Sequence, residues 1–360
     1  MVSITKEVEG CLKNIMTFWD KIKVFLKIDE ALADVRNHHI DALKGVAIIL
    51  VVLGHSIQLN DPNYDNNLLF RIVYSFQMPM FFFLSGFILS TQLAQSLLNY
   101  LKKNAVRLLV PFIVWYLISY IFVRFQTDIS LPAYLFNLIK SPAGGLWFLW
   151  VLFLNSFLLF AVLKIARFKN WLRWENYFVI AAILLSRTAS ADFLGLSEVK
   201  QYFPYYAAGF FVCKYIDVLK AKRKIIYAVA IVAFPVLILG WKRNEFPTFY
   251  PVLLQFFNDK GTARLIVSIY KYAVSFFGIA FSSFILARIK GTRVYWFLCW
   301  LGTLTLDIYV CHGYFIFGFG NGTLQYFSAA AASLILSCAL TLLLMKRFKI
   351  TRLLLLGQSR

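Results

Sequence analysis

The chain has 360 residues, of which 60% are hydrophobic and 15% are charged, and its formal charge is +20. This composition excludes a soluble enzyme, a secreted disulfide scaffold and a disordered chain, because each of those classes has fewer large apolar residues or more polar ones. The repeated apolar runs instead predict an all-α fold, a polytopic transmembrane helical bundle.

The first 37 residues are polar and amphipathic, and they form the first predicted unit, a cytoplasmic N-terminal segment over 1–37. No apolar run begins at Met1, so we expect no cleavable signal peptide. The cysteines show no Cys-x-x-Cys spacing and mostly lie in apolar runs, so we expect neither a disulfide framework nor a metal site. They are Cys11, Cys213, Cys299, Cys311 and Cys338.

Hydropathy predicts about ten spans in a transmembrane domain over 38–345, followed by a basic cytoplasmic tail over 346–360. The fifth span is the weakest because Arg187 interrupts it, so nine or eleven spans are alternatives. In chain order the spans cover roughly 40–59, 68–90, 108–123, 145–163, 176–194, 201–219, 225–241, 263–287, 294–317 and 324–345.

The distribution of basic residues predicts the orientation of these spans. With ten spans and a cytoplasmic N-terminus, 27 of the 37 Lys and Arg residues fall on the cytoplasmic side, nine fall outside, and Lys271 lies within a span. This asymmetry follows the positive-inside rule and places both termini in the cytoplasm. We therefore expect a multi-pass protein of the cell inner (plasma) membrane, with the bilayer and not nucleic acid as the partner of its basic charge.

The first span carries the polar residues most suggestive of chemistry. Lys44 and His55 are eleven residues apart, so they share one helical face with a rise of about 16 Å between them. Asp41 lies one turn from Lys44 and is expected to pair with it. Histidine is the side chain best suited to proton transfer near neutral pH, whereas a snorkelling lysine and a structural histidine are the alternative. His38 and His39 lie near the interface and are expected to be solvated.

The second span contains a proline and a small-residue pair. Pro79 removes a backbone N–H and therefore frees a carbonyl and kinks the helix. Ser85 and Gly86 permit a close approach of another helix, so we interpret them as packing residues, with Ser85 as a nucleophile the alternative.

Several motifs resemble, in order, those of the membrane-bound acyltransferase family 3. The first two spans supply the lead-in from Asp41 to His55 and the run Phe-Gln-Met-Pro-Met-Phe-Phe-Phe-Leu-Ser-Gly-Phe. The resemblance covers about residues 37–345, and its further motifs are Lys103–Arg107 with Leu108–Pro111, Gly145–Leu149, Phe203–Phe210 and Ile308–His312.

The resemblance implies an O-acetyltransferase that moves an acetyl group from cytoplasmic acetyl-CoA to a hydroxyl of a surface polysaccharide or lipid-linked sugar. It implies His55 as general base, with a cation to neutralise developing charge, for which Lys44 beside Asp41 is the candidate. His312 is a further catalytic candidate. Acetyl-CoA is the acyl donor and no metal is expected.

Basic residues of the loop between the second and third spans are candidates for binding the phosphates of acetyl-CoA. Lys103 and Arg107, with Lys44, form this predicted cofactor-binding set, and Lys102 adjoins them. Two positions depart from the family pattern: Lys44 stands where Arg is commoner, and Asn104 interrupts an Arg-x-x-Arg pattern that would end at Arg107.

Two alternatives stay open at the level of the sequence. A polytopic transporter or flippase of lipid-linked sugars also needs intramembrane polar residues, and the same enzyme class with a succinyl donor is the second alternative. The sequence predicts neither the acceptor sugar nor the oligomeric state, and direct transfer and a covalent acyl-histidine relay are both compatible with it.

Overall fold

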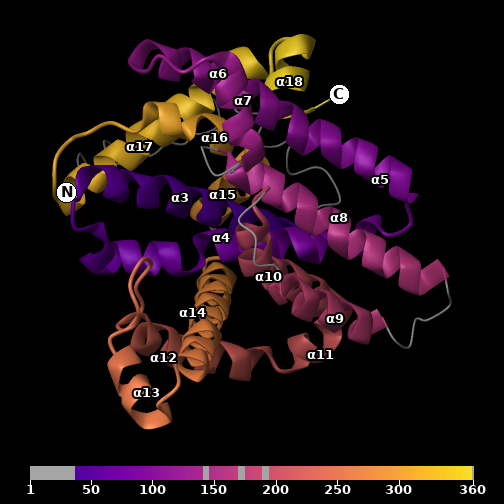
Figure 1. The fold of residues 1–360 in the computed structure, drawn as a ribbon, viewed down its shortest axis with the longest axis vertical. Helices are drawn as coiled ribbons and strands as arrows, with labels where there is room; N and C mark the ends of the chain where they lie inside the picture. The colour runs from indigo at the N-terminus through magenta and orange to yellow at the C-terminus, as the bar shows by residue number, and fades with distance from the viewer. Residues whose placement is uncertain (1–36, 141–145, 169–174, 189–193, 359–360) are drawn as a thin grey trace, which may run out of the picture.

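The computed structural model describes residues 37–140, 146–168, 175–188 and 194–358, and these residues form helices and no strand (Figure 1). The predicted N-terminal segment lies outside the described residues except for Asn37. The helices are α3 (His38–Asn60), α4 (Leu68–Leu89), α5 (Leu97–Asn104), α6 (Val110–Gln126), α7 (Leu131–Lys140), α8 (Trp147–Phe168), α9 (Glu175–Thr188), α10 (Leu196–Lys214), α11 (Ile216–Ala221), α12 (Arg223–Ile238), α13 (Tyr250–Phe257), α14 (Lys260–Arg288), α15 (Arg293–Thr303), α16 (Thr305–Cys311), α17 (Thr323–Leu340) and α18 (Lys349–Leu356).

Each predicted span overlaps a helix, but not every helix is long and apolar enough to cross a bilayer. Six helical segments in the described part of the chain meet that requirement, or up to seven if α15 and α16, bent by 64°, form one span. At the predicted fifth and seventh spans, α9 has 14 residues and α12 has 16. At the sixth, α10 begins with a polar turn. The predicted count of ten is therefore not reproduced by length and composition.

Small residues bring the central helices into contact. α4 packs on α10, and α3 packs on α15 and α4. A Cβ atom on Gly86 or Gly209 would lie 1.8 or 1.9 Å from a backbone carbonyl oxygen across the α4–α10 contact, and Gly45 and Gly302 have the same role between α3 and α15. Only hydrogen at these positions allows the backbones to approach so closely. The packing role predicted for Gly86 is confirmed.

The proline in α4 ties this helix to α14. Pro79 has no N–H to donate to the carbonyl of Ser75, one turn earlier. The hydroxyl of Ser275 on α14 donates to that carbonyl at 2.6 Å and accepts a hydrogen bond from the Tyr205 hydroxyl at 3.0 Å. The predicted free carbonyl is therefore satisfied by a neighbouring helix, which holds α14 against α4 and α10.

The segment predicted as a basic loop before the third span is helical instead. α5 continues through a π-helical turn, Ala105–Leu109, into α6, and Leu97–Phe125 forms one candidate span of 29 residues. The sequence prediction began this span at residue 108 because Lys102, Lys103 and Arg107 lower the local hydropathy. These residues lie on a helix, and π-helical turns are frequent at functional sites.

The C-terminal residues fold back onto the bundle. The Trp115 indole on α6 donates to the backbone carbonyl of Leu355 at 3.0 Å, and the Gln358 amide donates to the Asp307 carboxylate at 3.0 Å. A Cβ atom on Gly357 would lie 2.5 Å from a backbone carbonyl of the π-helical turn. The tail is thus packed against α6 and α16.

Candidate active site

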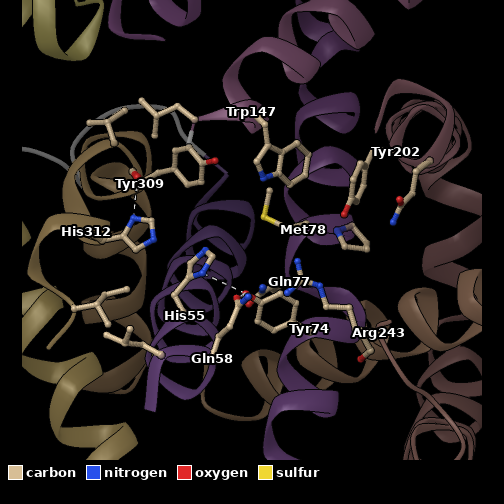
Figure 2. Close-up of a pocket in the computed structure, with 18 of the residues that line it drawn as sticks. His55, Gln58, Tyr74, Gln77, Met78, Trp147, Tyr202, Arg243, Tyr309 and His312 are labelled. Atoms are coloured by element: carbon tan, nitrogen blue, oxygen red, sulfur yellow. Dashed lines mark hydrogen bonds between the residues drawn. The ribbon is translucent and has the colours of Figure 1, made fainter. Parts of the chain in front are cut away.

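His55 and His312 lie in one cavity of about 900 Å³, which we call the histidine pocket (Figure 2). His55 comes from the last two turns of α3, and His312 opens the 3-10 turn His312–Phe315 that follows α16. Their ring centroids are 5.4 Å apart. The structure thus brings together two histidines that the sequence presented on the first and ninth predicted spans.

Hydrogen bonds fix the ring orientation of His55. The Tyr74 hydroxyl donates its single proton to Oε1 of Gln58 at 2.6 Å. Because the Gln58 amide is oriented with its oxygen towards Tyr74 and takes this proton, the Tyr74 oxygen can only accept the hydrogen bond from Nδ1 of His55, at 3.2 Å. Neutral His55 therefore carries its proton on Nδ1, which leaves the lone pair of Nε2 available to a reacting group.

His312 has the same arrangement. Its Nδ1 lies 2.8 Å from the backbone oxygen of Tyr309, and a carbonyl can only accept, so the ring proton of neutral His312 is on Nδ1. The loop behind it is held by Asn60, whose Oδ1 accepts from the backbone N–H groups of Phe319 and Gly320 at 2.7 and 3.0 Å. The end of α3 therefore positions the loop that follows His312.

The other walls of the histidine pocket are aromatic and amide side chains with two cations. Among the described residues that line it there is no Asp or Glu, whereas Arg243 and Lys271 both contribute. The aromatic and amide lining includes Tyr74, Trp115, Trp147, Tyr202, Trp241, Tyr309, Gln58, Gln77 and Gln201. Such a surface presents ring faces and hydrogen-bonding amides to a ligand.

The other candidate residues line a second cavity, of about 1340 Å³, at the opposite end of α3. We call it the basic pocket because Lys44, Lys102, Lys103 and Arg107 line it. The predicted pair of Lys44 with Asp41 is present, with Nζ and Oδ1 3.3 Å apart. The Gly357–Gln358 segment also lines this pocket.

The structure divides the four predicted catalytic residues between the two pockets. His55 and His312 line one, Asp41 and Lys44 the other, and the rise along α3 from Lys44 to His55 is about 16 Å. A charge that stabilises an oxyanion has to lie within hydrogen-bond distance of it. Lys44 is therefore not placed to neutralise charge beside His55, and its role belongs to the basic pocket. Tyr309 lines both pockets.

Sequence analysis missed Arg243 and Lys271 as site residues. Arg243 is in the segment between α12 and α13 and was counted only as an outer basic residue. Lys271 is the one basic residue that the prediction counted on neither side of the membrane but within a span, and an ionisable residue there is a functional candidate by default. That signal was available, whereas nothing in the local sequence of Arg243 distinguishes it.

Within the described ranges, no group of three or more His, Cys, Asp or Glu side chains is arranged to hold a metal ion. The four cysteines in the same ranges are free.

The sequence of this chain matches the acyltransferase domain of acyltransferase family 3 over residues 37–346. The chain belongs to this family. Nodulation protein NolL of Sinorhizobium fredii (strain NBRC 101917 / NGR234) is 30% identical over 233 residues, which are 59% of this chain and 60% of that protein. Nodulation protein NolL of Mesorhizobium japonicum (strain LMG 29417 / CECT 9101 / MAFF 303099) is 24% identical over 295 residues, 77% of this chain and 76% of that protein. No solved structure matches the chain.

Family membership supports an acyltransferase, and the apolar helices indicate a bilayer as its environment. The resemblance inferred from the motifs is thereby confirmed.

Proposed function

We propose that this acyltransferase family 3 member is an integral O-acetyltransferase of the cell inner membrane. It moves an acetyl group from acetyl-CoA to a hydroxyl of a surface polysaccharide or lipid-linked sugar, with His55 as general base. The observation that carries the proposal is the pair of pockets, one basic and one containing two histidines, which share Tyr309.

The donor belongs to the basic pocket. The phosphates of acetyl-CoA need cations, and Lys44, Lys102, Lys103 and Arg107 line this cavity. The pantetheine arm of the coenzyme is long and narrow, comparable in length to the rise of about 16 Å along α3. With the phosphates in the basic pocket, the arm can carry the thioester past Tyr309 towards His55.

The acceptor belongs to the histidine pocket. Nε2 of His55 takes the proton of the acceptor hydroxyl as its oxygen forms a bond to the thioester carbonyl carbon. The tetrahedral intermediate then collapses, the carbon–sulfur bond breaks, and the thiolate of coenzyme A accepts a proton. The hydrogen bond from Nδ1 of His55 to Tyr74 holds the proton of the neutral ring on Nδ1, so that the lone pair of Nε2 can accept the proton of the hydroxyl. His312, 5.4 Å away between ring centroids, is the second candidate base.

Substitution of His55 tests this proposal. His55→Gln keeps similar bulk and a hydrogen-bonding group but accepts no proton at neutral pH, so it should be as inactive as His55→Ala, with transfer lowered by about 10²- to 10⁴-fold. The measurement is acetylation of surface glycans, by mass spectrometry, in cells that lack the native protein and express each variant. Release of coenzyme A thiol by the purified protein distinguishes transfer from transport.

His39→Gln is the matched control, because His39 lies outside both pockets and contacts Ser283, at 2.9 Å. It should retain activity, and thermal melting should show that all three variants are folded. Substantial transfer by His55→Gln would assign His55 a structural role and make His312 the next candidate base.

A further inference from the structure

Two cations line the histidine pocket beside the proposed base. The guanidinium carbon of Arg243 lies 4.5 Å from the centroid of the Tyr74 ring, and the hydroxyl of that ring is the partner of His55. Lys271 is joined to Arg243 by a hydrogen bond from its Nζ to the Arg243 backbone oxygen at 3.3 Å. Figure 2 shows the Arg243 side chain extending across Tyr74 into the cavity.

The fold holds Arg243 in this position through its backbone. The Asp65 carboxylate accepts hydrogen bonds from the backbone N–H groups of Arg243 and Asn244 at 2.8 and 3.0 Å. These bonds fix the segment between α12 and α13 without engaging the guanidinium. Lys271 is similarly held over the Trp241 ring, with Nζ 5.9 Å from its centroid.

The local charges leave the pocket electropositive. Neither Arg243 nor Lys271 forms an ion pair within the described part of the chain, and no Asp or Glu lines the pocket. Asp65 is the acidic group that acts on Lys271, and its carboxylate oxygens already accept the backbone N–H groups of Arg243 and Asn244. Two cations thus line the cavity, and the carboxylate that acts on Lys271 does not line it.

From these observations we infer that the acceptor is an anionic saccharide, whose carboxylate or phosphate group is bound by Arg243 and Lys271 while its hydroxyl faces His55. The inference rests on the proposed function, because it assumes that the histidine pocket holds the acceptor. The surrounding aromatic rings suit the apolar faces of sugar rings; Trp147 and Tyr202, for example, have centroids 5.2 Å apart. A guanidinium is suited to carboxylate and phosphate groups, which it binds through two parallel hydrogen bonds.

Matched acceptors test the inference in purified protein. Methyl β-D-glucoside and methyl β-D-glucuronide differ in the group at C6, and glucose 6-phosphate provides a phosphate at the same position. The anionic acceptors should be preferred at least tenfold in kcat/KM. Arg243→Gln should raise KM for them by about 10- to 100-fold, the range of a charge-assisted hydrogen bond, with KM for the neutral glucoside little changed.

Lys271→Gln provides an independent variant, because Arg243 also contacts Tyr74 and its loss can disturb His55. Lys242→Gln is the matched control, since Lys242 is adjacent to Arg243 but pairs with Glu245 outside the pocket. It should leave the preference for anionic acceptors unchanged. Equal use of neutral and anionic acceptors, or a preference that survives both Arg243→Gln and Lys271→Gln, overturns the inference.

A binding measurement separates this inference from the proposed function. Without acetyl-CoA, the glucuronide or the sugar phosphate should raise the melting temperature of the wild-type protein but not of Arg243→Gln, whether or not acetyl transfer occurs. Absence of thiol release with every acceptor contradicts the proposed function alone. If phosphatidylglycerol in nanodiscs gives the stabilisation and neither saccharide does, the two cations bind lipid headgroups and the inference is wrong.

Discussion

The Lys44 ammonium lies 3.3 Å from the Asp41 carboxylate in the first turns of α3, at the end opposite to His55. The ion pair holds the lysine side chain at the wall of the basic pocket, where a phosphate would compete for its charge. Its position argues for a role in donor binding. Substitution of Lys44 is therefore expected to change KM for acetyl-CoA, whereas substitution of His55 is expected to lower the rate of acetyl transfer.

Substitution of Lys44 should therefore act mainly on the donor. Lys44→Ala should raise KM for acetyl-CoA by about 10- to 100-fold, because a charge-assisted hydrogen bond is lost. Lys44→Arg should retain much of the activity because it keeps the positive charge. A partial loss is expected because the guanidinium differs in geometry from the ammonium group. Initial rates against acetyl-CoA concentration measure this, with the exposed Lys222→Ala as control. A normal KM for Lys44→Ala would contradict donor binding at this residue.

At the scale of the helices, the contacts α4–α10 and α3–α15 determine where the site residues lie. α3 carries Lys44 and His55, and α4 carries Tyr74 and Gln77, so a small separation of either pair changes the shape of both pockets. The glycines at these contacts leave no room for a methyl group, whereas Gly318, in the loop after His312, has open space around it.

Alanine substitutions distinguish these glycines. Gly86→Ala and Gly302→Ala should each destabilise the protein by about 1–3 kcal/mol, because the added Cβ would lie 1.8 or 1.9 Å from a backbone oxygen and the helices have to move apart. Gly318→Ala should leave the melting temperature nearly unchanged. Thermal unfolding in detergent measures all three, and equal melting temperatures would show that the helix contacts are looser than described.

At the scale of the whole molecule, the structure contains two classes of helix. Within the part of the chain that the structure describes, six segments, or seven with the bent α15–α16 pair, are long and apolar enough to span a bilayer. Helices α9, α10 and α12 are shorter or more polar, and they coincide with the predicted fifth, sixth and seventh spans. If any one of these three does not cross the bilayer, the loops that follow it lie on the other side of the membrane from the predicted one. In Figure 1, α12, α13 and α14 form a group at one end of the molecule.

Cysteine labelling tests the orientation that the basic residues predict. In a background without native cysteines, Lys222→Cys should be protected from an impermeant maleimide in intact cells, because three other basic residues, Lys220, Arg223 and Lys224, surround it. Thr248→Cys should be labelled, because it is exposed and lies in the predicted outer segment after α12. Permeabilised cells control for reactivity. The opposite pattern would invert this part of the topology.

The sequence by itself determined the membrane class, the approximate positions of the helices and the family. It also placed Lys44 and Asp41 in one ion pair and identified Gly86 as a packing residue. These properties are local: hydropathy is a sum over neighbouring residues, and helical periodicity fixes which of them share a face.

Only the tertiary structure decided which distant residues meet. His312 reaches His55 because α15 packs on α3 and the chain bends before α16. Arg243 and Lys271 reach the same pocket because Ser275 bonds to the carbonyl freed by Pro79 and thereby holds α14 against α4. The division into two pockets has the same origin, since cavities form between helices whose packing depends on residues far apart in the chain.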